Sequence, residues 1–98
     1  MIKAKINRMF SDLRKNGYVA KQRFWCCQSC AWAALSTKYP ENQNAVFYHK
    51  QDAEDLDEKG QVHLAWRGDG KIISAIAHRN GLVTEWNGDE NTRILIHE

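Results

Sequence analysis

Signals that end helices recur at short intervals and limit this chain to short structural elements. Gly17, Pro40, Gly60 and Gly81 each follow a segment with clear hydrophobic periodicity. Glycine readily adopts the left-handed backbone that closes a helix, and proline cannot continue one because it lacks an N–H. With only 98 residues to divide, the chain has room for one hydrophobic core. We therefore expect a single domain over residues 1–98, without an internal boundary.

The spacing of apolar residues within these segments predicts four helices and four strands. Helical segments repeat their apolar residues every three or four positions, and strand segments every second position. The expected helices are 2–16, about 26–38, 52–58 and 71–80, and the expected strands are 45–49, 62–66, 82–86 and 92–97. The order α-α-β-α-β-α-β-β predicts an α+β fold, with a mixed sheet of about four strands and four helices packed on it. Residues 18–23 are expected to form an irregular or briefly extended connector.

Several side chains have predicted places in these elements. Asp52 and Asp69 precede or begin helical segments and are expected to cap them. The buried side of the last helix is expected to hold Ile72, Ile73, Ile76 and Ala77. Three of the tryptophans are expected in the core or on a sheet face, namely Trp32, Trp66 and Trp86.

Composition narrows the class of protein. Hydrophobic residues make up 43% of the chain and charged residues 27%, which is typical of folded globular domains and argues against disorder. No apolar run approaches the roughly 20 residues that a membrane-spanning helix needs. Residues 1–6 lack the apolar core of a signal peptide. We therefore expect a cytoplasmic protein that does not bind a membrane.

Charge is divided unevenly along the chain. Residues 1–38 carry eight basic residues and one acidic residue, whereas residues 39–98 carry six basic and eleven acidic residues. The simplest interpretation is that the two parts pack together and partly neutralise each other. A basic surface can also bind a protein partner or nucleic acid. The candidate partner-binding residues are Lys3, Lys5, Arg8, Arg14, Lys15, Lys21, Arg23 and Trp25.

All three cysteines lie within five positions, at Cys26, Cys27 and Cys30. The odd, clustered count argues against a secreted disulfide framework and for reduced thiols. Cys27 and Cys30 have the spacing at which two sulfurs bind one zinc ion, with Cys26 as a third ligand and His49 completing the set. There is no second Cys-x-x-Cys, so this is half a zinc motif. We favour packing of the thiols against the core at the start of a helix, since free cysteine is among the most buried residue types.

Two reactive roles for the same thiols are alternatives. A Cys-x-x-Cys at a helix N-terminus gains thiolate character and can support redox chemistry. Here, however, a tryptophan is followed by two cysteines instead of one, and the only proline is Pro40, so the similarity to a thioredoxin active site is superficial. A cysteine nucleophile with His49 as its base is also permissible, although four histidines make a chance pairing common.

Two longer motifs stand out beside several short ones: Cys-Cys-x-x-Cys at residues 26–30 and Tyr-His-x-Gln-Asp at residues 48–52. The shorter pieces are Leu13…Gly17-Tyr18, Leu64-Ala65-Trp66…Gly68, Gly81-Leu82…Glu85-Trp86-Asn87-Gly88 and Arg93-Ile94-x-Ile96. Together these motifs, in order over nearly the whole chain, resemble a family of small uncharacterised bacterial domains of unknown function. The resemblance implies one compact α+β domain and carries no activity.

The expected function is that of a small non-enzymatic binding module. Its partner would be another protein, on which the chain acts as an adaptor or an inhibitor, as accessory proteins of bacteria and their phages do. One alternative is a zinc-binding or thiol-redox site on the cysteine cluster with His49, which would make zinc the one cofactor. The other is nucleic-acid binding through the basic N-terminal helix. The sequence leaves the oligomeric state open.

Overall fold

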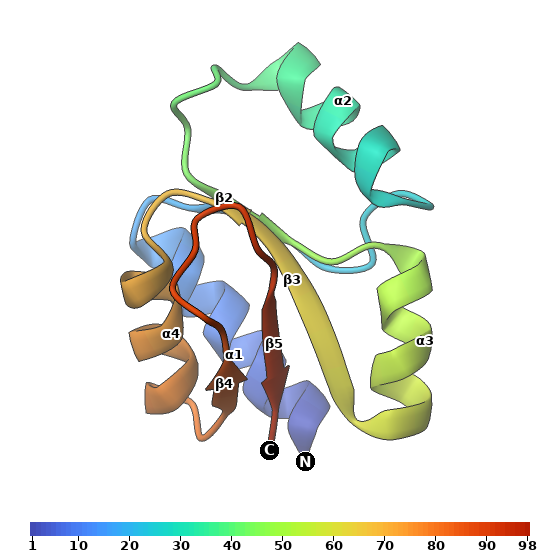
Figure 1. Ribbon diagram of the computed structural model, residues 1–98, viewed down its shortest axis with the longest axis vertical. Helices are drawn as coiled ribbons and strands as arrows, with labels where there is room; N and C mark the ends of the chain where they lie inside the picture. Colours follow the sequence, from blue (N-terminus) through green and yellow to red (C-terminus); the bar gives the residue numbers. More distant parts are fainter.

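The computed structural model describes residues 1–98 and contains four helices and five strands (Figure 1). The helices are α1 (Ile2–Lys15), α2 (Gln28–Lys38), α3 (Lys50–Lys59) and α4 (Gly70–Arg79). The strands are β1 (Val19–Lys21), β2 (Ala45–Phe47), β3 (Gln61–Arg67), β4 (Val83–Glu85) and β5 (Ile94–His97). The α+β class and the succession of the predicted elements are confirmed, with one strand more than the four expected.

The strands form one mixed sheet in the order β1-β2-β3-β5-β4. β1 and β2 are parallel, because the chain between them crosses over through α2. Every other neighbouring pair is antiparallel. The C-terminal half of the central strand β3 pairs with β2, and its N-terminal half pairs with β5. α3 lies beside that N-terminal half, where β2 has already ended (Figure 1).

The strand that periodicity did not predict is β1, in the segment expected to be a connector. It has three residues, of which only Ala20 is buried. Its pairing is supported from both sides: the Val19 N–H donates to the Asn44 carbonyl at 2.9 Å, and the Arg14 guanidinium donates to the Ala20 carbonyl at 2.8 Å. A strand this short shows too few alternations to be recognised from its own residues.

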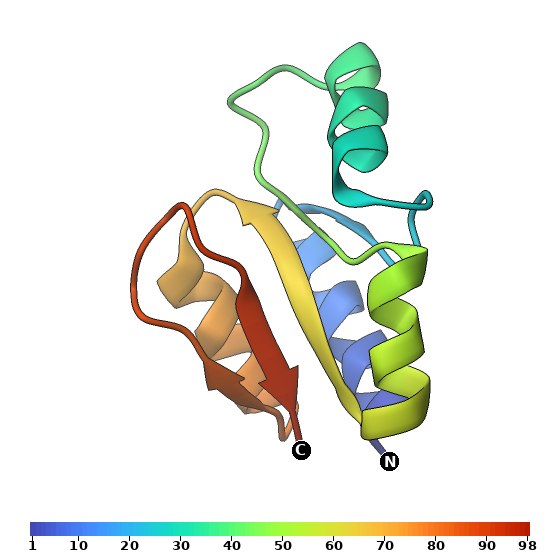
Figure 2. The same cartoon turned by 45° about the vertical axis from the view of Figure 1, so that its right-hand side comes forward.

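The main core lies between the sheet and the two helices α1 and α4, which pack against the same face (Figures 1 and 2). The buried positions of α1 recur every three or four residues, as an amphipathic helix requires. They are Ile6, Met9, Phe10 and Leu13. α4 contributes Ile73, Ile76 and Ala77, and the sheet contributes Val62, Leu64, Trp66, Ile94 and Ile96. This core fixes the sheet, from which the loop that bears the cysteines and the helix α3 extend.

α2 covers the opposite face of the sheet over a smaller area (Figure 2). Its buried residues are Ala31 and Leu35, which pack on a separate cluster with Ala45, Phe47 and Ala65. Trp32 adds an edge-on contact with the Phe47 ring, at 4.8 Å between ring centroids. α2 is therefore attached to the rest of the domain by few apolar side chains.

Two details of the helices differ from the prediction. α3 begins at Lys50, and its N-cap is His49, whose Nδ1 accepts from the Asp52 N–H at 3.2 Å. Asp52 is thus inside the first turn. The His49 imidazole caps the helix, a role that we expected of Asp52. In α4, Asp69 caps as predicted by accepting from the Lys71 N–H. Ile72, which we expected to be buried, is 45% exposed, because it lies at the edge of the apolar stripe.

The basic and acidic parts of the chain are joined by ion pairs, as the simplest interpretation of the charge pattern predicts. Lys3 and Arg23 both contact Asp57, at 2.7 Å and 2.9 Å, and Lys5 contacts Glu98 at 2.7 Å. Arg23 and then Lys3 hold the pKa of the Asp57 carboxyl well below its usual range. None of the four helices is both long and apolar enough to span a bilayer.

Candidate thiol site

The cysteines follow a short loop that leaves the end of β1 and is fastened to the segment after β2. The Phe24 N–H donates to the Tyr48 carbonyl at 2.9 Å, and the Lys50 N–H donates to the Trp25 carbonyl at 3.0 Å. Arg23 and Trp25 both have a left-handed backbone, with φ of 50° and 64°. Non-glycine residues rarely take this conformation. The direction of the loop therefore could not be predicted from its residue types. The turn carries the next residues outward to the surface.

Three thiols meet at the N-terminus of α2. Cys27 is the N-cap, Cys26 precedes it, and Cys30 lies in the first turn. Their three sulfur atoms lie within 4.8 Å of one another, and the Sγ atoms of Cys26 and Cys27 are 3.9 Å apart. All three cysteines are free. The sulfurs therefore form one cluster without a disulfide bond.

The cluster is at the surface, which makes the expectation of core packing wrong. Cys26 and Cys30 are exposed, and Cys27 is partly buried. The side of α2 that faces the sheet is occupied by Ala31 and Leu35 instead. The physical reason is the turn at Arg23 and Trp25, which places the thiols on the outer side of the helix start.

The helix start makes the thiols unequal. The pKa of the Cys27 thiol is lowered, first by the backbone N–H of Cys30 and then by the Cys30 thiol. Backbone N–H groups at a helix N-terminus stabilise a thiolate because they carry partial positive charge. The pKa of Cys30 is raised to about 11, chiefly by the Cys27 sulfur next to it. Cys27 thus loses its proton more readily than Cys30.

An apolar hollow adjoins the cluster on the outer side of α2. It is shallow and open to solvent, has a volume of about 400 Å³ and is lined by Trp25, Cys30, Ala33, Ala34 and Thr37. The Trp25 indole is 51% exposed and packs edge-on against Phe24. Of the basic and aromatic residues predicted to bind a partner, Trp25 is therefore the one that borders the thiols.

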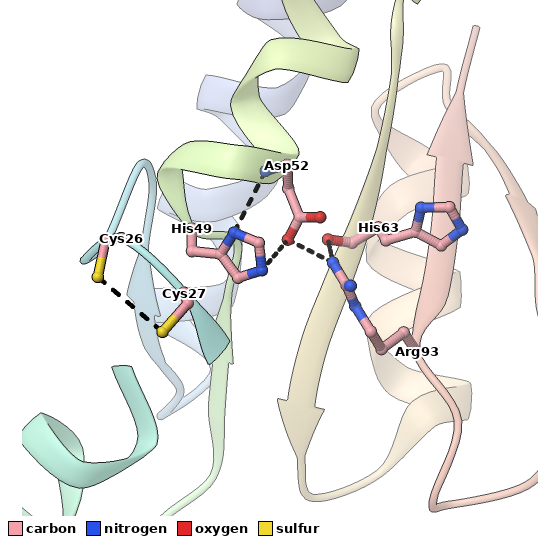
Figure 3. A network of polar contacts seen from close by, with 6 residues as sticks. All are labelled: Cys26, Cys27, His49, Asp52, His63 and Arg93. Carbon is pink, nitrogen blue, oxygen red and sulfur yellow. Dashed lines mark hydrogen bonds and ion pairs between the residues drawn. The ribbon is translucent and has the colours of Figure 1, made fainter. Parts of the chain in front are cut away.

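His49 lies in a separate polar network (Figure 3). The residue is only 6% exposed. Nδ1 accepts from the Asp52 N–H, and Nε2 is 3.1 Å from Oδ2 of the same residue. Since Nδ1 is an acceptor, the hydrogen is on Nε2 and is donated to the carboxylate. Figure 3 shows both nitrogens turned to Asp52, so the sulfur cluster is made of cysteines alone.

Arg93 completes this network and is the polar residue that our sequence analysis did not select. Its guanidinium donates to Asp52 Oδ2 and, at 2.8 Å, to the His63 carbonyl. Asp52 is 8% exposed, so the ion pair lies largely out of water. The available signals were its place at the start of the expected strand 92–97 and in the Arg93-Ile94 piece, and neither indicates a buried partner.

The remaining predicted partner-binding residues lie on α1, β1 and the following loop. Lys3, Lys5 and Arg23 form the ion pairs described above, and Arg14 donates to the Ala20 carbonyl. Arg8 and Lys15 project from the exposed side of α1. Partner binding by this surface stays a prediction.

Comparison with known proteins gives one match. No curated protein and no solved structure matches the chain. A family model described as "Domain of unknown function (DUF6891)" matches residues 3–98, and therefore includes the cysteine cluster and the His49 network. Since the match extends over nearly every residue, the chain belongs to the DUF6891 family of domains of unknown function.

Proposed function

We propose that this domain binds a zinc ion through the thiolates of Cys26, Cys27 and Cys30. The observation that supports this most directly is the mutual distance of the three sulfurs, all within 4.8 Å. Two thiolates that each lie about 2.3 Å from a tetrahedral zinc ion are about 3.8 Å from each other. The Sγ atoms of Cys26 and Cys27 are 3.9 Å apart. An ion can thus be bound with little rearrangement of this pair.

The chemistry of the cluster supports the same proposal. Thiolate, not thiol, is the zinc ligand, so binding must release protons. Cys27, whose pKa is lowered by the helix start, gives a first anchoring thiolate. The positive ion then favours deprotonation of its neighbours, Cys30 included. Exposure of the cluster leaves a path for the ion to enter.

Three cysteines leave one position of a tetrahedral ion to be filled. His49 was the predicted fourth ligand, but both of its ring nitrogens contact Asp52. We infer that solvent occupies the fourth position, as it does in zinc sites with three protein ligands. A variant His49→Gln is then expected to bind zinc with an unchanged Kd. A tenfold weaker Kd in that variant would instead assign the fourth position to the imidazole.

The test is a competition titration of reduced, chelator-treated protein with zinc, with metal content measured in parallel. We expect one ion per chain, and a Kd raised at least about tenfold by Cys26→Ser, Cys27→Ser or Cys30→Ser, since each removes one ligand. Ser29→Ala is the matched control, because it changes the same turn without touching a sulfur. Absence of stoichiometric zinc, or equal binding by all variants, would overturn the proposal.

A second candidate is the predicted protein-binding role, as an adaptor or inhibitor. What favours it is the exposed Trp25 indole beside the apolar hollow on α2, since tryptophan is a frequent anchor of protein interfaces. The basic residues support this role less than expected, because three of the seven basic candidates form ion pairs within the domain. Nucleic-acid binding relies on the same basic residues and is weakened equally.

A further inference from the structure

The cysteine cluster has the parts of a second activity that does not need metal. We propose that the metal-free domain carries out dithiol–disulfide exchange, in which Cys27 attacks a disulfide, Cys30 resolves the product and zinc binding blocks both steps. The exchange itself is independent of the proposed zinc site, and only the blocking rests on it. The substrate class is a disulfide that can reach an exposed sulfur cluster, such as glutathione disulfide.

Cys27 is assigned as the attacking residue by its position. It is the N-cap of α2, at the end of the helix where the first backbone N–H groups have no partner within the helix and carry partial positive charge. Thiol–disulfide exchange begins with a thiolate, and its rate depends on the thiolate fraction and on access. Cys27 is partly exposed, so an incoming disulfide can reach it.

Cys30 is assigned as the resolving residue by elimination of Cys26. A disulfide requires Cα atoms about 4.4–6.8 Å apart, whereas adjacent residues are only about 3.8 Å apart across a trans peptide bond. Cys26 and Cys27 are adjacent and cannot pair without distorting the backbone. Cys30 is one helical turn from Cys27 on the same side, and its sulfur is within 4.8 Å. Cys30 is therefore the partner with which Cys27 can close a disulfide.

The reaction balances in two steps. The Cys27 thiolate attacks one sulfur of the disulfide, forms a mixed disulfide and expels the other half as a thiolate. The Cys30 sulfur, after losing its proton, attacks the Cys27 sulfur and expels the second half. The protein loses two protons and two electrons, and the substrate is reduced to two thiols, which take up the protons. The product disulfide uses two of the three proposed zinc ligands, so oxidation and zinc binding exclude each other.

The exchange is tested on reduced protein kept metal-free with a chelator, to which glutathione disulfide is added at neutral pH. Mass spectrometry after acid quench follows the products. Wild type and Cys26→Ser are expected to lose two hydrogens, with Cys27 joined to Cys30. Cys30→Ser is expected to stop at one glutathione on Cys27. Cys27→Ser should react at least about tenfold more slowly. Glutathione at equal rates on all cysteines, or an unchanged rate in Cys27→Ser, would overturn the assignment.

A second arm separates this inference from the proposed function. Protein preloaded with zinc and freed of excess metal is expected to react at least about tenfold more slowly than the chelated protein. If zinc binds through the cysteines but exchange stays fast, the blocking is refuted and the zinc site stands. If zinc does not bind, the proposed function fails, while the chelated arm still decides whether exchange occurs.

Discussion

Asp52 is the residue whose surroundings are most constrained by polar contacts. Its carboxylate is largely buried and is contacted by Arg93 and by His49 Nε2, and its own N–H is capped by His49 Nδ1. A buried carboxylate is tolerated only when it is paired and hydrogen-bonded. One polar atom of the network, Arg93 Nε, is buried without a hydrogen-bond partner. The ion pair between Asp52 and Arg93 therefore fixes how α3 packs beside the start of β5. Its removal should lower the stability of the fold.

We predict that Arg93→Met lowers the free energy of unfolding by about 3 kcal/mol, because it leaves the Asp52 charge buried with only a neutral imidazole beside it. The measurement is urea unfolding at neutral pH. Adding Asp52→Asn to Arg93→Met should restore part of the loss, since the charge is then gone. Arg79→Met, which replaces an exposed arginine of α4, is the control and should change stability by less than about 0.5 kcal/mol. Equal effects of the two arginine substitutions would contradict the importance of the network.

At this scale the sequence identified the right residue types but not their surroundings. Cys26, Cys27 and Cys30 were recognised as one group, and their sulfurs do converge. Their exposure depends on the left-handed backbone of Arg23 and Trp25, which neither residue type favours. His49 was a candidate ligand or base for the thiols in the alternative interpretations, whereas its ring contacts a carboxylate three residues along the same chain segment. Such local pairing competes with long-range ligation in a way that spacing alone does not reveal.

Among the elements, α2 has the weakest attachment and carries the candidate site. It buries only Ala31 and Leu35, whereas α1 buries four side chains. Two hydroxyls in its last turn, those of Ser36 and Thr37, donate to carbonyls of the preceding turn, which slightly destabilises a helix. Segments with few buried apolar contacts open locally more often than the core. α2 should therefore open without unfolding of the whole domain.

Zinc binding is predicted to suppress this local opening. The ion would join Cys26 and Cys27, before α2, to Cys30 inside it, so opening of the helix start would separate the ligands. At free zinc about 100 times Kd, opening that destroys the site becomes about a hundredfold rarer. Hydrogen exchange of the amides in Gln28–Lys38, with and without zinc, measures the effect.

Two comparisons make the hydrogen-exchange experiment decisive. At the same zinc concentration, Cys27→Ser should gain at most about a tenth of the added protection of the wild type, because its Kd is raised at least about tenfold. The amides of α1 in the wild type should keep the same exchange rates with and without zinc. Equal protection of α1 and α2 would indicate stabilisation of the whole domain instead of the helix start. No added protection of α2 despite bound zinc would place the ion elsewhere.

The helices and the longer strands were predictable because their apolar residues repeat often enough to define a period. β3 and the helices α1 and α4 appear within two residues of the expected bounds. β1 was missed because it is three residues long, and its place at the edge of the sheet depends on pairing with β2. That pairing arises only in the folded chain and cannot be predicted from Val19–Lys21 alone.

On the scale of the whole molecule, the division of charge along the chain becomes a contact between its two parts. Asp57 on α3 is held by Lys3 of α1 and Arg23 of the loop before the cysteines. The end of the chain is likewise tied to α1, where Lys5 lowers the pKa of the Glu98 carboxyl. The sequence predicted this neutralisation in general, although which acidic residues take part depends on the packing of α3 beside β3. One consequence is that the basic surface left for a partner is smaller than the count of lysines and arginines suggests.

The Asp57 contacts predict how stability depends on pH. Arg23 and Lys3 lower the pKa of this carboxyl in the folded state, so the folded protein holds the ionised form more strongly than the unfolded chain does. The resulting stabilisation is complete above the unfolded pKa of about 4, and it is lost as pH falls further towards the folded pKa. Because the carboxylate is exposed and screened by solvent, the effect is modest. It is also weakened by salt.

Asp57→Asn is therefore expected to lower the Tm by a few degrees at pH 7. The difference in Tm between wild type and variant should stay constant down to about pH 5, then narrow below about pH 4, where wild type loses the charge as well. It should also shrink in high salt. Asp55→Asn is the matched control on the same helix: its carboxylate meets only Lys59, at 3.7 Å, and its loss should hardly change the Tm. A Tm difference for Asp57→Asn that is the same at pH 7 and pH 3 would show that the contact acts through packing, because a charge interaction must disappear with the charge.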